Sequence, residues 1–201
     1  MAAVFGCAAL VTGCGGGSRQ DAGEHSGAFQ MAVVQAKFPA KQSIAHPETL
    51  ELQVRNTGSK TVPNVAITVD SLNYSSNYAE LAADKRPIWV IERGPGASPK
   101  LPVQSEEVTS PGNAQTAYVN TWALGALPPR QTQRFTWQVV PVKAGDYTVN
   151  YTVSAGLAGK SKAQLSSGAP VQGHFTVAIA GTPAGKFVDP STGRIVTGTY
   201  P

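Results

Sequence analysis

Six segments of the chain alternate apolar and polar residues with a period of two, and this pattern limits the fold more than any other feature. In the segment LELQV at 50–54, for example, Leu and Val alternate with Glu and Gln. Such alternation is typical of a β-strand with one face buried and the other in water. The six segments are 29–33, 50–54, 65–69, 135–139, 147–153 and 175–179.

The composition and the turn signals agree with an all-β fold. Charged residues make up only 14% of the chain, whereas Gly (21) and Pro (15) are frequent. Turn sequences such as Asn56-Thr57-Gly58 and Ala144-Gly145-Asp146 separate the alternating segments. Six strands with one apolar face each would leave that face in water if they formed a single open sheet. We therefore predict two sheets packed face to face in one domain over 29–180.

Two longer runs carry recurring strand and turn patterns. The run LELQVRNTGSKTVPNVAITV at 50–69 ends one strand in R-N-x-G and begins the next after a Pro. The run LGALPPRQTQRFTWQVVPVKAGDYTVNYTV at 124–153 contains L-x-P followed by A-G-x-Y-x-V. Together they resemble the immunoglobulin-like domains of bacterial envelope proteins, among them the cell-adhesion-related bacterial domain. The resemblance implies an immunoglobulin-like antiparallel β-sandwich and brings no catalytic residue with it. The usual Pro-Gly turn is Pro128-Pro129-Arg130 here, so we expect this turn to differ in detail.

Residues 71–120 depart from this pattern and form a long inserted loop region. About fifty residues is long for a loop, and long loops in compact domains are usually functional or disordered. Within the insertion, RPIWVIE at 86–92 predicts an added strand. Tyr74, Tyr78 and Trp89 form a possible binding surface. The alternative for Trp89 is that it packs with Ile88 and Ile91 onto the sandwich.

The N-terminal segment 1–14 is apolar and has no charge, and its length suits the apolar region of a signal peptide better than a membrane span. It ends in Val11-Thr12-Gly13-Cys14, which resembles the bacterial lipobox: an aliphatic residue three places before a cysteine, with small residues between. The resemblance implies cleavage before Cys14 and attachment of a lipid to its thiol. No Lys or Arg precedes the apolar stretch, so an ordinary N-terminal strand or helix is the alternative.

The flanking segments complete the predicted organisation. Residues 15–28 are rich in Gly and polar residues and are predicted to be a flexible tether. Residues 181–201 are predicted to be an extended tail, in which Phe187-Val188 and Ile195-Val196 could pair as a small hairpin. The predicted location is the extracytoplasmic face of the cell membrane, with the membrane as partner through the lipid.

No sequence motif indicates catalysis, a metal or a cofactor. The two cysteines, Cys7 and Cys14, both lie in the leader, and the histidines His25, His46 and His174 have no ligand spacing. The net charge of +4 comes from scattered Lys and Arg, which argues against a nucleic-acid surface. We therefore expect no metal, no cofactor and no nucleic-acid partner.

Three functional hypotheses follow. The first is a lipid-anchored, non-catalytic binding or structural module, with a role in adhesion or in contacts between envelope proteins. The second is an accessory domain for carbohydrate or cell-wall polysaccharide, using the three aromatic residues of the insertion. The third is an envelope hydrolase of unfamiliar type, which would need a cleft joining Asp84, Glu92 or Glu106 to a polar strand face.

Overall fold

The computed structural model describes residues 23–70, 72, 87–96, 114, 116, 118–183, 185–189 and 191–198. All regular elements in these ranges are β-strands, and they include no helix that could cross a membrane. The strands are β1 (Gly27–Lys37), β2 (Lys41–Ser43), β3 (Glu48–Asn56), β4 (Ala66–Val69), β5 (Trp89–Arg93), β6 (Thr121–Ala123), β7 (Thr132–Pro141), β8 (Gly145–Ser154), β9 (Ser161–Gln164), β10 (Gln172–Ala180), β11 (Gly185–Val188) and β12 (Ile195–Gly198).

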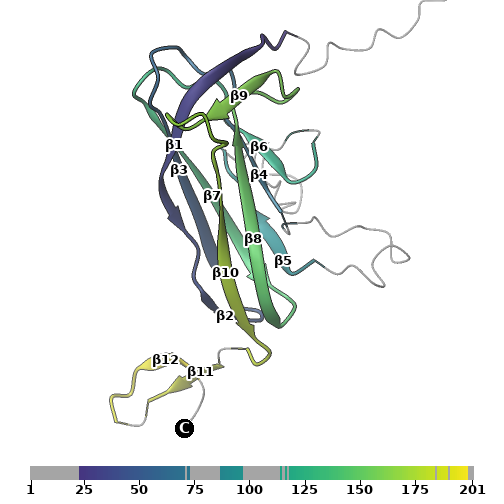
Figure 1. Ribbon diagram of the computed structural model, residues 1–201. Helices are drawn as coiled ribbons and strands as arrows, with labels where there is room; N and C mark the ends of the chain where they lie inside the picture. Colours follow the sequence, from purple (N-terminus) through teal and green to yellow (C-terminus); the bar gives the residue numbers. More distant parts are fainter. Residues whose placement is uncertain are drawn as a thin grey trace, which may run out of the picture.

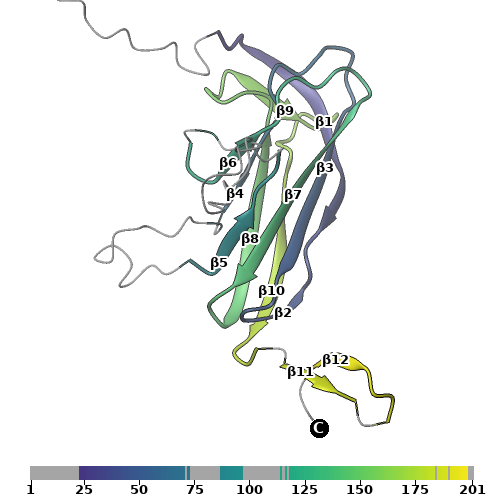
Figure 2. The ribbon, with the colours of Figure 1, turned by 180° about the vertical axis from the view of Figure 1, so that it is seen from behind.

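Ten of these strands form two five-stranded sheets packed face to face. One sheet has the order β5-β7-β3-β1-β9 and the other the order β2-β10-β8-β4-β6. Figure 1 looks onto the second sheet, and Figure 2 looks onto the first from behind. The protein is therefore an immunoglobulin-like β-sandwich, as predicted, and the six alternating segments fall in β1, β3, β4, β7, β8 and β10.

The chain crosses from the first sheet to the second between β1 and β2. β1 pairs with β3 in the first sheet and, over Gly27–Gln30, runs parallel to β9 in the same sheet. After a bend at Ala40, β2 joins the second sheet and runs parallel to the end of β10. These two short parallel pairs lie at the sheet edges, and the other strand pairs of the sandwich are antiparallel.

The inward faces of the strands form one continuous apolar core. In β3 the side chains of Leu50, Leu52 and Val54 are completely buried, while the residues between them are partly exposed. Burial of one such side chain stabilises a fold by about 1.5–3 kcal/mol. The largest buried side chains are Trp89, Trp122, Trp137 and Phe135.

Asn56, the Asn of the R-N-x-G pattern, is buried at the end of β3. Its Nδ2 donates hydrogen bonds to the carbonyls of Lys60 (2.8 Å) and Leu127 (2.9 Å), and its Oδ1 accepts one from the backbone N–H of Gly58 (3.0 Å). Leu127 is the Leu of the L-x-P pattern. The two patterns that carry the family resemblance are therefore bonded to each other through one side chain.

The turn at Pro128-Pro129-Arg130 contains a residue with positive φ, although it lacks the glycine of the usual Pro-Gly turn. Arg130 has a φ of 65°, and the turn is closed by the N–H of Gln131, which donates to the carbonyl of Pro128 (3.3 Å). The N–H of Arg130 donates to the carbonyl of Asn56 (2.9 Å). An arginine thus adopts the left-handed conformation that glycine would adopt at lower cost.

The insertion contributes one described strand. β5 contains most of the predicted strand at 86–92 and pairs antiparallel with β7 at the edge of the first sheet. The described part of 71–120 also includes Leu72 and Ala114, both of which are buried. Most other residues of the insertion lie outside the described residues.

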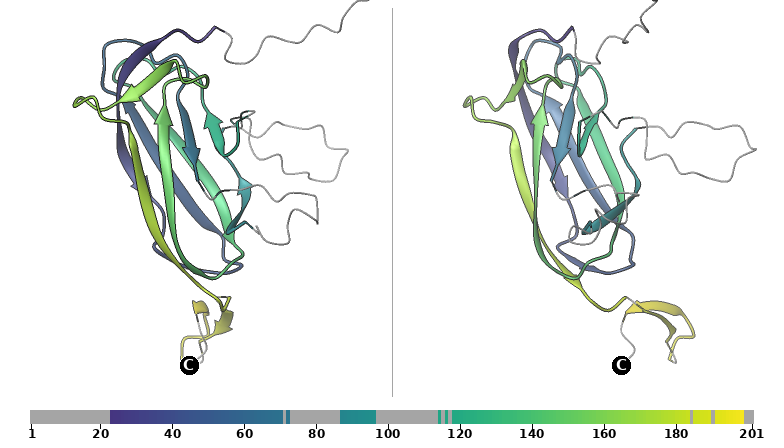
Figure 3. Two further views of the ribbon diagram at one scale, coloured as in Figure 1. Left: turned by 45° about the vertical axis from the view of Figure 1, so that its right-hand side comes forward. Right: turned by 90° about the vertical axis from the view of Figure 1, so that its right-hand side faces the viewer.

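The N-terminal boundary of the domain differs from the predicted one, whereas β10 ends at Ala180, the predicted last residue of the sandwich. The predicted tether 15–28 is too long, because Gly27 and Ala28 already belong to β1. In the C-terminal segment β11 and β12 pair antiparallel, with Val188 opposite Ile195, which is the hairpin considered above. Figure 3 shows this hairpin beyond one end of the sandwich, whereas β1 begins at the opposite end.

Candidate functional site

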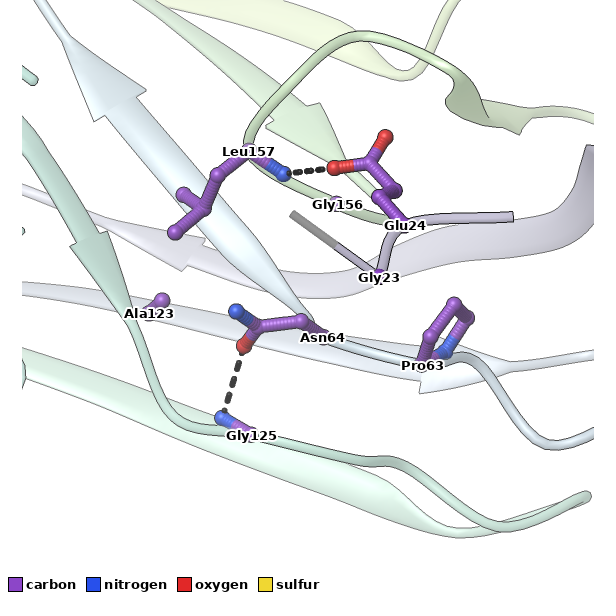
Figure 4. A pocket seen from close by; sticks show the side chains of 8 residues that line it. All are labelled: Gly23, Glu24, Pro63, Asn64, Ala123, Gly125, Gly156 and Leu157. Atoms are coloured by element: carbon purple, nitrogen blue, oxygen red, sulfur yellow. Dashed lines mark hydrogen bonds between the residues drawn. The ribbon is translucent and has the colours of Figure 1, made fainter. Parts of the chain in front are cut away.

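A pocket of about 390 Å³ lies at the end of the sandwich where β1 begins. Three loops meet there: the β3–β4 connection, the β6–β7 connection and the β8–β9 loop (Figure 4). The residue before β1 that closes the pocket is Glu24. The lining residues are Gly23, Glu24, Pro63, Asn64, Ala123, Gly125, Gly156 and Leu157.

Glu24 is held by the backbone of the β8–β9 loop. Its Oε2 accepts hydrogen bonds from the N–H groups of Leu157 (2.7 Å) and Ala158 (2.6 Å), and its Oε1 accepts one from the N–H of Ser161 (2.7 Å). Gly156 allows this approach, because a Cβ at that position would overlap the carboxylate. The loop thus surrounds a carboxylate with backbone donors, which is the arrangement of an anion-binding nest.

The electrostatics of Glu24 follow from two opposing effects. Burial is the largest single effect and raises the pKa of the carboxyl group. Hydrogen bonds from the backbone N–H groups of Ser161, Ala158, Leu157 and Lys160 together outweigh it, so the pKa of Glu24 lies below its ordinary value. Glu24 is therefore a carboxylate at neutral pH.

Asn64, in the β3–β4 connection, forms hydrogen bonds to the other two loops of the pocket, the β6–β7 connection and the β8–β9 loop. Its Oδ1 accepts a hydrogen bond from the N–H of Gly125 (3.1 Å), and its own N–H donates to the carbonyl of Ala155 (3.2 Å). Gly125 has a φ of 83°, which favours glycine. The walls of the pocket are consequently fixed by backbone and amide hydrogen bonds, and its charged group is already engaged by the backbone.

Within the described ranges no three His, Cys, Asp or Glu side chains come together as a metal site would require. Among the histidines, the side chains of His25 and His174 are exposed, and Nδ1 of His46 lies 3.1 Å from the carboxylate of Glu48.

Trp89 does not belong to an exposed binding surface. Its side chain is completely buried, and its ring packs against Phe38 (5.6 Å between ring centroids) and Tyr147 (5.8 Å). Its Nε1 donates to Oε1 of buried Gln42 (2.7 Å). The predicted role of Trp89 in the binding surface is thus corrected to the packing alternative, because no face of its ring is free to stack on a ligand.

The remaining predicted site residues are distributed as follows. Cys14 and the lipobox residues Val11, Thr12 and Gly13 lie outside the described residues, as do Tyr74 and Tyr78. Of the carboxylates considered for hydrolysis, Glu92 is exposed on β5, while Asp84 and Glu106 lie outside the described residues.

Sequence reasoning missed Glu24, because it assigned this residue to a flexible tether. Glu24 and its partners are more than 130 residues apart in the chain. The one local signal is the loop sequence AGLAGK at 155–160, whose two glycines leave neighbouring backbone N–H groups uncovered.

The comparisons with known proteins concern the fold. No protein-family model matches the sequence, and no curated protein matches it. The CARDB domain of a protein from Pyrococcus furiosus, in a crystal structure described as a complex with di-metal ions, is 16% identical, with a TM-score of 0.43 over 76% of this chain and 94% of that chain. Native alpha-2-macroglobulin from Escherichia coli, from domain MG7 to its C-terminus, is 12% identical, with a TM-score of 0.40 over 83% of this chain and 21% of that chain. Similarities of this size carry no argument about function.

Proposed function

We propose that the protein is a lipid-anchored module of the bacterial cell envelope, attached through Cys14 to the extracytoplasmic face of the cell membrane. Its immunoglobulin-like sandwich serves as a non-catalytic scaffold that binds another envelope protein. The observation that carries this proposal is the lipobox-like Val11-Thr12-Gly13-Cys14 at the end of an apolar stretch, a short distance before an immunoglobulin-like domain.

The position of Glu24 limits how far such a module could extend from the membrane. Residues 15–23 separate Cys14 from Glu24. The ten residue steps from Cys14 to Glu24 span at most about 36 Å, since one extended residue covers roughly 3.3–3.6 Å. The loop end of the sandwich would therefore stay close to the membrane, and the β11–β12 hairpin at the opposite end would point toward a partner (Figure 3).

The anchor is tested with the full chain expressed in a bacterium that processes lipoproteins. The wild type, Cys14→Ser and the matched control Cys7→Ser are compared by membrane fractionation and intact mass. We expect the wild type and Cys7→Ser in the membrane fraction with added lipid mass, and Cys14→Ser soluble and without it. Soluble, unmodified protein in all three cases would refute the anchor.

The exposed face is tested in the same cells. A protease added to intact spheroplasts should degrade the wild type, whereas a cytoplasmic marker protein should survive. Protection of the anchored protein from the protease would place the sandwich inside the cell and refute the proposed location.

A further inference from the structure

The β8–β9 loop presents its backbone donors to a single acceptor. The N–H groups of Leu157, Ala158 and Ser161 converge on both oxygens of Glu24 at 2.6–2.7 Å. These distances lie at or just below the short end, about 2.7 Å, of charge-assisted N–H···O hydrogen bonds. An amide side chain in the same place would turn its NH₂ group toward N–H donors, so the loop selects a carboxylate over a neutral group of the same shape.

The engaged carboxylate lies at the start of the parallel pairing between β1 and β9. Next to it, the Ser161 hydroxyl donates to the carbonyl of His25 (2.6 Å), and the N–H of Gly27 donates to the carbonyl of Lys160 (3.1 Å). The parallel pairing itself covers only Gly27–Gln30. The contact of Glu24 therefore fastens the beginning of the described chain to a short and otherwise weak sheet edge.

We propose that the loop Gly156–Ser161 is a carboxylate-binding site and that Glu24 is its internal ligand, which holds the N-terminal segment on the sandwich. The two ends of the loop are held independently of Glu24, by the N–H of Asn64, which donates to the carbonyl of Ala155 (3.2 Å), and by the pairing of β9 with β1, so the site persists when the Glu24 carboxylate is removed. An external carboxylate can then occupy it. This inference does not depend on the lipid anchor.

The test is chemical rescue in the full chain. Glu24→Ala keeps the Cβ and removes the Cγ and the carboxylate, which leaves the space that acetate fills. Sodium acetate is titrated at pH 7 against sodium chloride of equal ionic strength, and the amide signals of Leu157, Ala158 and Ser161 are followed by NMR. We expect saturable shifts of these three signals in Glu24→Ala. Without acetate, hydrogen exchange at these three amides should be at least about tenfold faster in Glu24→Ala than in the wild type. Adding acetate should slow this exchange in Glu24→Ala again.

Matched variants separate a site from a general salt effect. The wild type and Glu24→Gln should show no saturable shift, because their side chains already fill the space. Glu24→Ala combined with Gly156→Ala should show none either, because the added Cβ overlaps the position of the carboxylate. The absence of saturable shifts in Glu24→Ala, or equal shifts in the wild type, would overturn the proposal.

Glu24→Gln provides a second test if Glu24→Ala does not fold. It preserves the shape of the side chain, and we expect exchange at the same three amides to be at least about tenfold faster than in the wild type. Unchanged exchange would show that the loop does not discriminate a carboxylate from an amide, and the proposal would be wrong.

Discussion

The hydrogen bond between Trp89 and Gln42 connects β5 of one sheet to β2 of the other through the core. Trp89 is completely buried and Gln42 is 5% exposed. The indole Nε1 donates to Oε1 of Gln42 (2.7 Å), and Nε2 of Gln42 donates to the carbonyl of Pro39 (2.9 Å). Since the bond between Trp89 and Gln42 is buried, removing one of these two partners leaves the other without compensation.

The magnitudes follow from this geometry. Trp89→Phe leaves the Gln42 oxygen without its donor, at about 1–3 kcal/mol, and the smaller ring leaves space that costs about 1–2 kcal/mol more. Gln42→Leu leaves the buried indole N–H without an acceptor, so we expect a loss of about 1–3 kcal/mol. The double variant removes donor and acceptor together, and its loss should be smaller than the sum of the single losses by about 1–2 kcal/mol.

The assay is urea unfolding of the full chain, followed by far-ultraviolet circular dichroism. With a slope of about 2 kcal/mol/M, Trp89→Phe should lower the midpoint by about 1–2.5 M and Gln42→Leu by about 0.5–1.5 M, without changing the slope. Trp122→Phe is the matched control, because Trp122 is equally buried but its Nε1 has no hydrogen-bond partner among the described residues. In the double variant of Trp122→Phe and Gln42→Leu, the losses in the free energy of unfolding should simply add. If the losses of Trp89→Phe and Gln42→Leu also add, within about 0.5 kcal/mol, the hydrogen-bond argument is refuted.

Three further changes have defined outcomes in the same unfolding assay. Arg130→Gly should raise the free energy of unfolding by about 0.5–1 kcal/mol, because Arg130 has a φ of 65°, and a lower value would contradict strain at this turn. Gly173→Ala should lower the free energy of unfolding by about 1–3 kcal/mol, because the new Cβ would overlap the Tyr151 ring. Its control is Gly58→Ala, whose Cβ meets only ordinary contacts and which should change the free energy of unfolding by less than about 0.5 kcal/mol. The lowered pKa of Glu24 means that its contribution is complete above the pKa of the unfolded chain and is lost as the pH falls through the folded value. Thermal unfolding from pH 7 to pH 3 should therefore show a steeper loss of stability in the wild type than in Glu24→Gln, and parallel curves would contradict this.

The longer strands could be predicted from the sequence because alternation over five or more residues is a strong local signal. β2, β6 and β9 were not predicted, since they are only three or four residues long and cannot show a period. Their positions depend on partners: β9, for example, is a strand because it pairs with the start of β1. The crossing of the chain from one sheet to the other between β1 and β2 was missed for the same reason.

The candidate site was the least predictable part of the molecule. A lone glutamate in a Gly-rich polar stretch resembles any solvated linker, and only the fold brings Glu24 to the β8–β9 loop. Trp89 shows the opposite case. An aromatic residue in an insertion could suit a ligand surface, but its burial against Phe38 and its bond to Gln42 make it part of the core.

The R-N-x-G pattern is explained by the fold and does not indicate a particular function. Asn56 bonds the turn that follows β3 to the segment that precedes β7, through two carbonyls and one N–H. Any sandwich that joins these two connections in this way needs a buried side chain with both donors and an acceptor at this position, and asparagine provides both. The pattern therefore accounts for the family resemblance in terms of folding alone. A specific function of this chain must therefore be sought in features that Asn56 does not determine, namely the segment that precedes β1, the carboxylate bound by the β8–β9 loop and the hairpin at the opposite end of the sandwich.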